Sequence, residues 1–297
     1  MVSTLDTIRL NAMAKINLGL DVIGKRPDGY HDVRMIMQSI RLYDRIDIES
    51  TPQPGISLRT NLPFLPTDER NIAYKAARRM LEDFHIDGGV KISIEKHIPV
   101  AAGMAGGSTD CAAVLYGMDQ LFSLGLGQEK LMKIGLSLGA DVPYCLLRQA
   151  ALAEGIGEVL TPLPPIAPCH ILIAKPPVSV STGQVYQSLI LDRDTPHPDI
   201  DGMARAMKTG SLPGVVSRLG NVLESVTISM HPVIADIKKN IMSAGALGAL
   251  MSGSGPTVFG IFDDEGKARA AYDIIRDSGL VQQVFLTSPV DFEKQAE

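Results

Sequence analysis

The chain has 297 residues, enough for one large domain or two of ordinary size. Hydrophobic residues make up 45% and charged residues 21% of the sequence, which is typical of a globular protein with a substantial core. The formal net charge of −5 argues against nucleic acid and against an anionic membrane as partners. No signal peptide or membrane-spanning apolar run is evident, and the three cysteines lack metal-ligand spacing. A cytoplasmic protein with reduced thiols is therefore expected.

Residue patterns in the first half predict strands and helices in alternation. Apolar and polar residues alternate over residues 16–22, which predicts a half-buried strand, and residues 45–49 and 90–95 alternate in the same way. Between them, apolar residues recur at helical spacing over residues 71–84. A short helix is expected over residues 128–138.

A proline cluster at Pro162, Pro164, Pro165 and Pro168 is the best candidate for a domain boundary. We therefore expect an N-terminal domain over residues 1–165 and a C-terminal domain over residues 166–297. The elements expected after the cluster are strands at 171–174, 246–251, 257–262 and 284–287, and helices at 199–207, 213–225, 232–244 and 265–278. Because neither half shows a strict βαβ alternation, the fold class predicted is α+β with largely antiparallel sheets.

A glycine-rich segment, residues 99–110, precedes an apolar run over residues 111–122 and reads P-V-A-A-G-M-A-G-G-S-T-D. Such a turn at a helix N-terminus directs several backbone N–H groups and the positive end of the helix dipole to one point, an arrangement that binds phosphate. Glycine permits close approach of an anion because it has no Cβ. The alternative is a flexible loop followed by a helix capped by Ser, Thr or Asp.

This segment is not one of the commoner phosphate loops, since the chain has neither a Walker sequence nor a Gly-x-Gly-x-x-Gly fingerprint. Residues 99–108 resemble instead the second signature of the GHMP small-molecule kinases. Residues 14–18 (A-K-I-N-L) resemble the first signature and residues 251–257 (M-S-G-S-G-P-T) the third. The resemblance implies a two-domain α+β architecture. It has an N-terminal ATP-binding domain with a mixed or antiparallel sheet and a ferredoxin-like C-terminal domain.

A narrower resemblance lies in residues 26–31 (R-P-D-G-Y-H) and 139–144 (G-A-D-V-P-Y). They are similar to a branch of the family that acts in non-mevalonate isoprenoid biosynthesis and phosphorylates the 2-hydroxyl of a cytidine diphosphate sugar alcohol. The resemblance implies ATP as co-substrate, Mg²⁺ as the metal, and a monomer or weak homodimer. Two alternatives remain open: a GHMP kinase with a mevalonate, phosphomevalonate, homoserine or sugar acceptor, and a nucleotide-binding regulator without activity.

Asp141 and Lys15 are the candidate catalytic residues. Phosphoryl transfer requires an oriented nucleophile, and the resemblance implies that Asp141 accepts the proton of the acceptor hydroxyl. Asp141 could instead be a loop residue that bonds its own backbone. Lys15 opens an apolar strand, where a buried cation requires a partner, unless it is solvated at the strand start. In the resembling kinases the matching lysine lies beside the catalytic Asp, where it stabilises the attacking oxygen.

The resemblance implies an ATP-binding set that combines the glycine-rich segment with two residues outside it. Ser108 is the expected ligand of Mg²⁺ or the β-phosphate, unless it only caps the helix, and Lys96 and Asn71 are expected to frame the adenosine. The turn at residues 252–256 joins two strands, and its backbone is expected near the phosphates. The complete set is Pro99, Val100, Ala101, Ala102, Gly103, Met104, Ala105, Gly106, Gly107, Ser108, Thr109, Asn71 and Lys96.

The acceptor-binding residues implied by the resemblance come from two regions. Tyr30 is expected to stack on the cytosine and His31 to hydrogen-bond its edge, although both could simply start a strand after the Asp-Gly turn. Thr182 and Tyr186 open a helix in the second half and are expected to approach the cytidine from the other side. Asn17 shares a strand face with Lys15 and could bind substrate or hold Asp141, or be a neutral strand residue.

Overall fold

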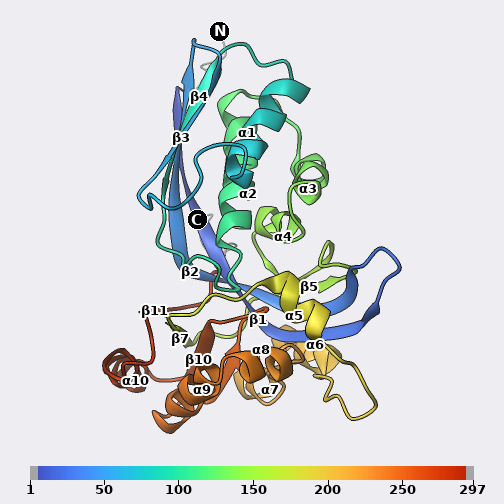
Figure 1. Cartoon of the computed structure of the whole chain (residues 1–297), viewed down its shortest axis with the longest axis vertical. Coiled ribbons are helices and arrows are strands. Elements are labelled where there is room, and N and C mark those ends of the chain that lie inside the picture. Colours follow the sequence, from blue (N-terminus) through green and yellow to red (C-terminus); the bar gives the residue numbers. More distant parts are fainter. Residues whose placement is uncertain (1–5, 292–297) are drawn as a thin grey trace. The chain divides into compact units, whose positions relative to one another are not determined.

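The computed structural model describes residues 6–291, which form two compact units (Figure 1). The first unit takes its described residues from Met1–Ala14, Leu42–Val100 and Ala105–Arg148, and the second from Lys15–Arg41, Ala101–Met104 and Gln149–Glu297. Two long strands, β1 (Thr7–Lys25) and β2 (His31–Thr51), contribute residues to both units. The units are therefore interleaved along the chain, and the division expected at residue 165 stays a prediction.

The first unit is a small sheet with helices on one side (Figure 1). Its central strand β4 (Gly89–Glu95) pairs antiparallel with the second half of β2 and parallel with β3 (Gly55–Thr60). Helix α1 (Ile72–Asp83) lies between β3 and β4 in the chain, and β4 is followed by α2 (Gly106–Leu121), α3 (Gln128–Leu136) and α4 (Val142–Leu147). The helices expected over 71–84 and 128–138 are confirmed as α1 and α3.

The alternating pattern of β2 and β4 explains the core of this unit. In β2 the even-numbered residues from Leu42 to Ile48 are buried, while Arg45 and Glu49 are exposed. The buried isoleucines pack with those of β4 and with the apolar faces of α1 and α2. Asp44 lies on the buried face of β2, and Lys96 continues the buried face of β4. Both charged groups are thus placed inside an apolar layer by the strand period alone.

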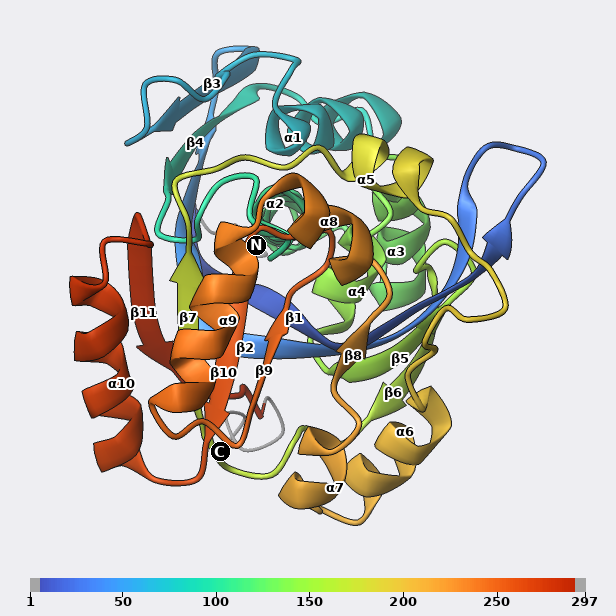
Figure 2. The same cartoon turned by 60° about the horizontal axis from the view of Figure 1, so that its bottom comes forward.

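The second unit contains a four-stranded antiparallel sheet (Figure 2). Its strands are β7 (His170–Lys175), β9 (Gly248–Met251), β10 (Val258–Phe262) and β11 (Gln283–Thr287), arranged in the order β11-β7-β10-β9. The helices α9 (Val233–Ser243) and α10 (Glu265–Asp277) pack against it. One helix precedes β9 and the other precedes β11, so the chain follows the βαββαβ order of a ferredoxin-like domain. The predicted α+β class and ferredoxin-like domain are confirmed.

Two further strand pairings complete the second unit. The hairpin of β5 (Ala150–Glu154) and β6 (Val159–Leu163) pairs with the first half of β2, and β8 (Gly220–Asn221) pairs parallel with β1. The remaining helices are α5 (Thr182–Ser188), α6 (Ile200–Lys208), α7 (Leu212–Val216) and α8 (Glu224–Met230). Within residues 6–291 no helix is both long enough and apolar enough to cross a membrane.

Two local expectations are wrong. Residues 16–22 are not half-buried, because β1 is buried on both faces from Ala14 to Val22. Residues 213–225 do not form one helix: α7 ends at Val216, and β8 separates it from α8. Gly220 permits this break, because a Cβ there would lie 2.9 Å from Pro198 Cβ.

Candidate active site

Lys15 and Asn17 lie side by side on the buried part of β1. The Lys15 Nζ donates to Asn17 Oδ1 at 2.8 Å, and only 5% of Lys15 and none of Asn17 is exposed. The amide nitrogen of Asn17 is directed to the Sδ of Met35, 3.4 Å away. A solvated lysine at a strand start is therefore ruled out, and Asn17 Oδ1 supplies one acceptor for the buried cation. Asn17 holds Lys15, and a contact of Asn17 with substrate stays a prediction.

The glycine-rich segment contacts β1 at Lys15. The Lys15 backbone N–H donates to Met104 O at 3.2 Å, and its Nζ donates to Gly103 O at 3.4 Å. Gly103 has a φ of +71°, and a Cβ there would lie 2.2 Å from Ser252 O. Two alanines of the segment, Ala101 and Ala105, also have positive φ, at 51° and 57°. Left-handed backbone at non-glycine residues is strained and is common at functional sites.

The third glycine turn packs on the same segment. Ser252 Oγ donates to Gly103 O at 2.9 Å, and the backbone N–H of Asn17 is directed to Ser252 Oγ at 3.4 Å. Asn221 Nδ2 donates to the carbonyls of Met251 and Gly253, both at 2.8 Å, and so fixes the turn. The expected hairpin is confirmed, since β9 and β10 pair antiparallel on either side. The segments that resemble the three family signatures thus contact one another within the second unit, through Lys15 and Asn17, Gly103 and Met104, and Ser252.

The structure places the start of α2 two residues earlier than Ser108. Ala105 occupies the N-cap position without a side-chain bond, and Gly106 is the first helical residue. Ser108 therefore does not cap the helix, and its role as a ligand stays a prediction. The serine is half-buried in the first turn of α2. A Cβ on Gly139 would lie 3.9 Å from Ser108 Oγ, so the serine lies beside the segment that leads to Asp141.

Asp141 lies in the turn that follows α3 and immediately precedes α4. It occupies the N-cap position with a φ of −81°, and its carboxylate makes no capping bond to the backbone of α4. The alternative role, in which the carboxylate only serves its own backbone, is therefore not supported at this helix. Asp141 and Ser108 belong to the first unit, whereas Lys15 belongs to the second. The pairing of Asp141 with Lys15 stays a prediction.

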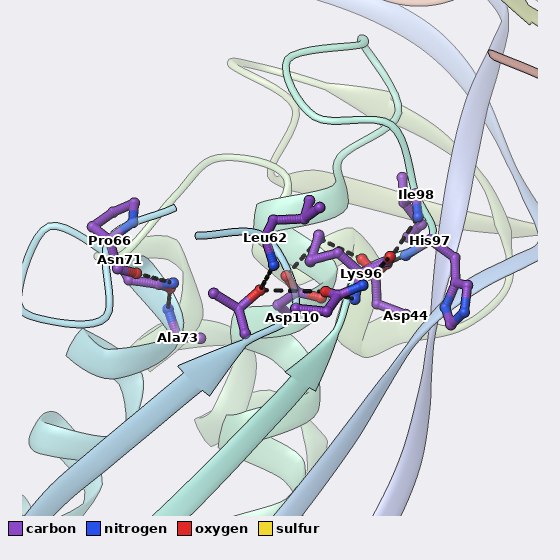
Figure 3. A network of polar contacts seen from close by, with 11 residues as sticks. Asp44, Leu62, Pro66, Asn71, Ala73, Lys96, His97, Ile98 and Asp110 are labelled. Carbon is purple, nitrogen blue, oxygen red and sulfur yellow. Dashed lines mark hydrogen bonds and ion pairs between the residues drawn. The ribbon is translucent and has the colours of Figure 1, made fainter. Parts of the chain in front are cut away.

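Lys96 belongs to a buried cluster of charges that sequence reasoning missed (Figure 3). Its Nζ forms ion pairs with Asp44 and, at 2.7 Å, with Asp110, and all three side chains are at most 7% exposed. Burial acts to lower the pKa of Lys96, but the carboxylates of Asp110 and Asp44 together outweigh it and raise that pKa. Burial raises the pKa of Asp110 well above its ordinary value, against the attraction of Lys96. The positive charge of Lys96 is therefore compensated locally, and its contact with the adenosine stays a prediction.

Asn71 has a structural role that was not expected. It is the N-cap of α1: its Oδ1 accepts from the Ala73 N–H, and its Nδ2 donates to Pro66 O, both at 2.9 Å (Figure 3). These bonds fix the loop before α1 to the helix N-terminus. Contact of Asn71 with the adenosine stays a prediction.

The predicted acceptor residues meet in the second unit. The rings of His31 and Tyr186 lie 5.3 Å apart between centroids. The turn before them is held by Asp28, whose Oδ1 accepts from the Tyr30 N–H at 3.1 Å, and His31 is the first residue of β2. Tyr30 is 59% exposed, so its ring is available to a ligand. Burial and the nearby Lys25 lower the pKa of His31, which favours a neutral imidazole.

Thr182 connects the acceptor residues to the third glycine turn. It is the first residue of α5, whose N-cap is Ser181, and its hydroxyl lies 2.8 Å from Ser254 Oγ. The helix expected at this position is confirmed. Tyr186 lies one helical turn after Thr182 on α5. The contact of Thr182 with Ser254 therefore anchors the start of the helix that carries the Tyr186 ring.

These features define a class of protein. Two family models match the chain: GHMP kinases N terminal domain over residues 71–149 and GHMP kinases C terminal over residues 193–279. The chain belongs to the GHMP kinases. Its relatives include the 4-diphosphocytidyl-2-C-methyl-D-erythritol kinase of Lachnoclostridium phytofermentans, which is 58% identical over 95% of this chain and 97% of that protein. The enzyme of the same name from Lachnospira eligens is 55% identical over 95% of this chain and 98% of its own length.

Solved structures agree with this assignment. A crystal structure of 4-(cytidine 5'-diphospho)-2C-methyl-D-erythritol kinase is 31% identical with a TM-score of 0.82, covering 96% of this chain and all of that one. The homoserine kinase from Cytophaga hutchinsonii reaches a TM-score of 0.79 at 20% identity, covering 97% of this chain and 96% of that one. At this identity the second likeness concerns the fold alone.

Proposed function

We propose that the chain transfers the γ-phosphoryl group of ATP to the 2-hydroxyl of 4-diphosphocytidyl-2-C-methyl-D-erythritol. The observation that carries this proposal is the ring pair of His31 and Tyr186, which lies in the same unit as Lys15 and the Gly103 turn. An aromatic face with a neutral imidazole beside it suits a pyrimidine, and mevalonate, homoserine and galactose have none. The names of the relatives that match nearly the whole chain point to the same acceptor.

Cytosine recognition is assigned to Tyr30, His31 and Tyr186. Tyr30 presents a largely exposed ring next to His31, and Tyr186 contacts His31 from α5. A neutral imidazole offers one donor and one acceptor to the edge of the base. Thr182, held by Ser254, and Asn17 are the polar groups proposed for the rest of the acceptor.

The chemical step is assigned to Asp141 and Lys15. The acceptor oxygen forms a bond to the γ-phosphorus as the bond to the β–γ bridging oxygen breaks, which leaves ADP. Asp141 accepts the proton of the hydroxyl or orients it, and Lys15 stabilises the charge that develops on the attacking oxygen. Asn17 and Gly103 O hold the ammonium of Lys15 for this task, because both accept hydrogen bonds from its Nζ.

The triphosphate is assigned to the glycine-rich segment and the start of α2, where backbone N–H groups lack helical partners. The hydroxyl of Ser108, in the first turn of α2, is a hard oxygen donor of the kind that Mg²⁺ prefers, so it would hold the ion together with oxygens of the nucleotide. When bound, the ion neutralises charge on the transferring phosphoryl group. Residues 6–291 contain no cluster of three or more His, Cys, Asp or Glu that could hold a metal. A cytoplasmic monomer or weak homodimer completes the proposal.

Single alanine variants of Tyr30, His31 and Tyr186 test the assignment of the acceptor. Stacking of a base on an aromatic ring contributes roughly 1–3 kcal/mol, so each tyrosine variant should raise the KM for the cytidine substrate by about 5- to 150-fold. His31→Ala should raise it as well, because polar groups of the cytosine lose their partner. The measurement is steady-state kinetics with each substrate varied separately.

The KM for ATP should stay near normal in all three variants, since Lys96 and Asn71, which are expected to frame the adenosine, belong to the other unit. Tyr272→Ala, which removes an aromatic ring from α10, serves as the control and should leave both KM values unchanged. An unchanged acceptor KM in all three variants would show that the cytidine binds elsewhere.

A further inference from the structure

Asp44 makes more contacts than an ion pair requires. No part of it is exposed, and its Oδ1 accepts backbone N–H groups from His97 at 2.6 Å and Ile98 at 2.8 Å. Its Oδ2 accepts from the ammonium of Lys96. One carboxylate on β2 thus fixes three consecutive residues, Lys96 to Ile98, that lie immediately before the glycine-rich segment (Figure 3).

Asn61 holds the same stretch from the other side. Its Oδ1 accepts from the Lys96 N–H at 2.8 Å, and its Nδ2 donates to Lys96 O at 3.1 Å. The backbone of Lys96 is therefore held by an amide and its side chain by carboxylates. A residue fixed at both ends loses most of its rotamer freedom before any ligand binds, and this reduces the entropy cost of binding.

The ammonium of Lys96 lies next to the start of α2. A Cβ on Gly106, the first residue of that helix, would lie 3.3 Å from Lys96 Nζ. Asp44 and Asp110 accept two of its three N–H bonds, and among the described residues the third has no acceptor. Asp110 belongs to α2 itself, so Lys96 connects β2 to the helix N-terminus. The cluster thus holds one remaining donor in place beside the proposed phosphate site.

We propose that Asp44 is a positioning residue for the nucleotide: it fixes the ammonium of Lys96 beside Gly106 and sets the direction in which the glycine-rich segment leaves β4. This inference rests on the proposed function, because it assumes that the nucleotide phosphates bind at the start of α2. Asp44 touches no substrate. It acts through Lys96 and through the two backbone N–H groups that it accepts.

Asp44→Asn tests the inference with little change in shape. An asparagine retains an oxygen acceptor for the N–H groups of His97 and Ile98, but it turns an amide NH₂ group or a neutral oxygen toward Lys96. The ammonium of Lys96 then has Asp110 as its one charged partner in this cluster. The dissociation constant for ADP, measured by calorimetry, should rise at least about tenfold, the scale expected for losing a charged hydrogen bond. The KM for ATP should rise in parallel, and the KM for the acceptor should not change.

Asp47→Asn is the matched control, because Asp47 lies on the same strand and pairs with Arg9 at the surface. It should leave nucleotide affinity unchanged. The double variant Asp44→Asn/Lys96→Met should bind ADP no more weakly than Lys96→Met alone, because Asp44 acts through Lys96. It also removes both charges of the pair, so it tests the inference even if Asp44→Asn fails to fold.

Three results would overturn the inference: a folded Asp44→Asn that binds ADP within twofold of the wild type, additive losses in the double variant, or a double variant with wild-type affinity. Failure of the nucleotide assignment on which the inference rests gives a different result, because the wild-type protein itself would then bind no ADP. Failure of the acceptor assignment alone leaves the ADP measurements unaffected. Thermal melting of each variant, followed by circular dichroism, separates a lost fold from a displaced lysine.

Discussion

Replacement of Asp141 by Asn should lower kcat by at least about 10²-fold, the usual scale for losing a general base. The change is nearly isosteric and keeps an oxygen acceptor at the same position, so the loss is expected in the chemical step. Affinity for ATP should stay near normal because the phosphates are assigned to other residues. Steady-state and single-turnover kinetics at saturating substrates measure the effect on the chemical step.

Asp87→Asn is the control for this variant, because Asp87 is an exposed carboxylate of the same unit between α1 and β4. Its kcat should equal that of the wild type. A near-normal kcat for Asp141→Asn would remove Asp141 from the chemical step. A loss that appears only in the KM for the acceptor would show that the residue binds substrate without taking part in proton transfer.

Gly103→Ala should reduce kcat/KM for ATP by about 10²-fold. The new Cβ would lie 2.2 Å from Ser252 O and 3.1 Å from Gly255 O, so the glycine-rich segment has to move away from the third glycine turn. Displacement of a binding segment by about 1 Å can cost a factor of 10² in rate. The φ of +71° adds a conformational penalty of about 1–2 kcal/mol for alanine.

Gly125→Ala separates these two effects. Gly125 has a similar φ of +62°, but a Cβ there meets nothing within 4 Å, and it lies between α2 and α3, outside the proposed site. This control should lower the melting temperature without lowering kcat/KM for ATP. Equal losses of activity in both variants would mean that backbone strain, and not the contact with Ser252, explains the result at Gly103.

Much of the fold followed from local patterns. The predicted bounds of helices with strong apolar periodicity, such as α1 and α10, agree with the structure to within a few residues. The reason is that their buried apolar residues recur with the 3.6-residue period of a helix. The strand period failed for β1, since contacts on both of its faces bury polar Asn17 and Asp21 as completely as their neighbours. The helix expected over 213–225 failed because pairing of Gly220 with Gly19 overrides local propensity.

Only part of the candidate site could be predicted from the sequence. Short motifs point to the glycine-rich segment, Lys15 and Ser108 as site residues. The structure shows that Lys15 is buried and that Ser108 does not cap α2, and the roles of these residues stay predictions. Asp44 was missed, although an acidic residue on the apolar face of a strand is a signal that could have drawn attention to it. From the sequence, Asp110 indicates only a possible helix cap. Its partnership with Lys96 joins residues 14 positions apart, and no local rule predicts it.

The most direct test of the central claim is phosphoryl transfer to a defined acceptor. The wild-type protein is incubated with ATP, Mg²⁺ and one of four acceptors: 4-diphosphocytidyl-2-C-methyl-D-erythritol, mevalonate, homoserine or galactose. ADP release is followed by a coupled assay, and the product by phosphorus NMR. We expect turnover with the cytidine compound alone, with one new phosphomonoester at its 2-hydroxyl for each ADP formed. Turnover only with an acceptor that lacks cytidine, or nucleotide binding without turnover of any acceptor, would contradict the account.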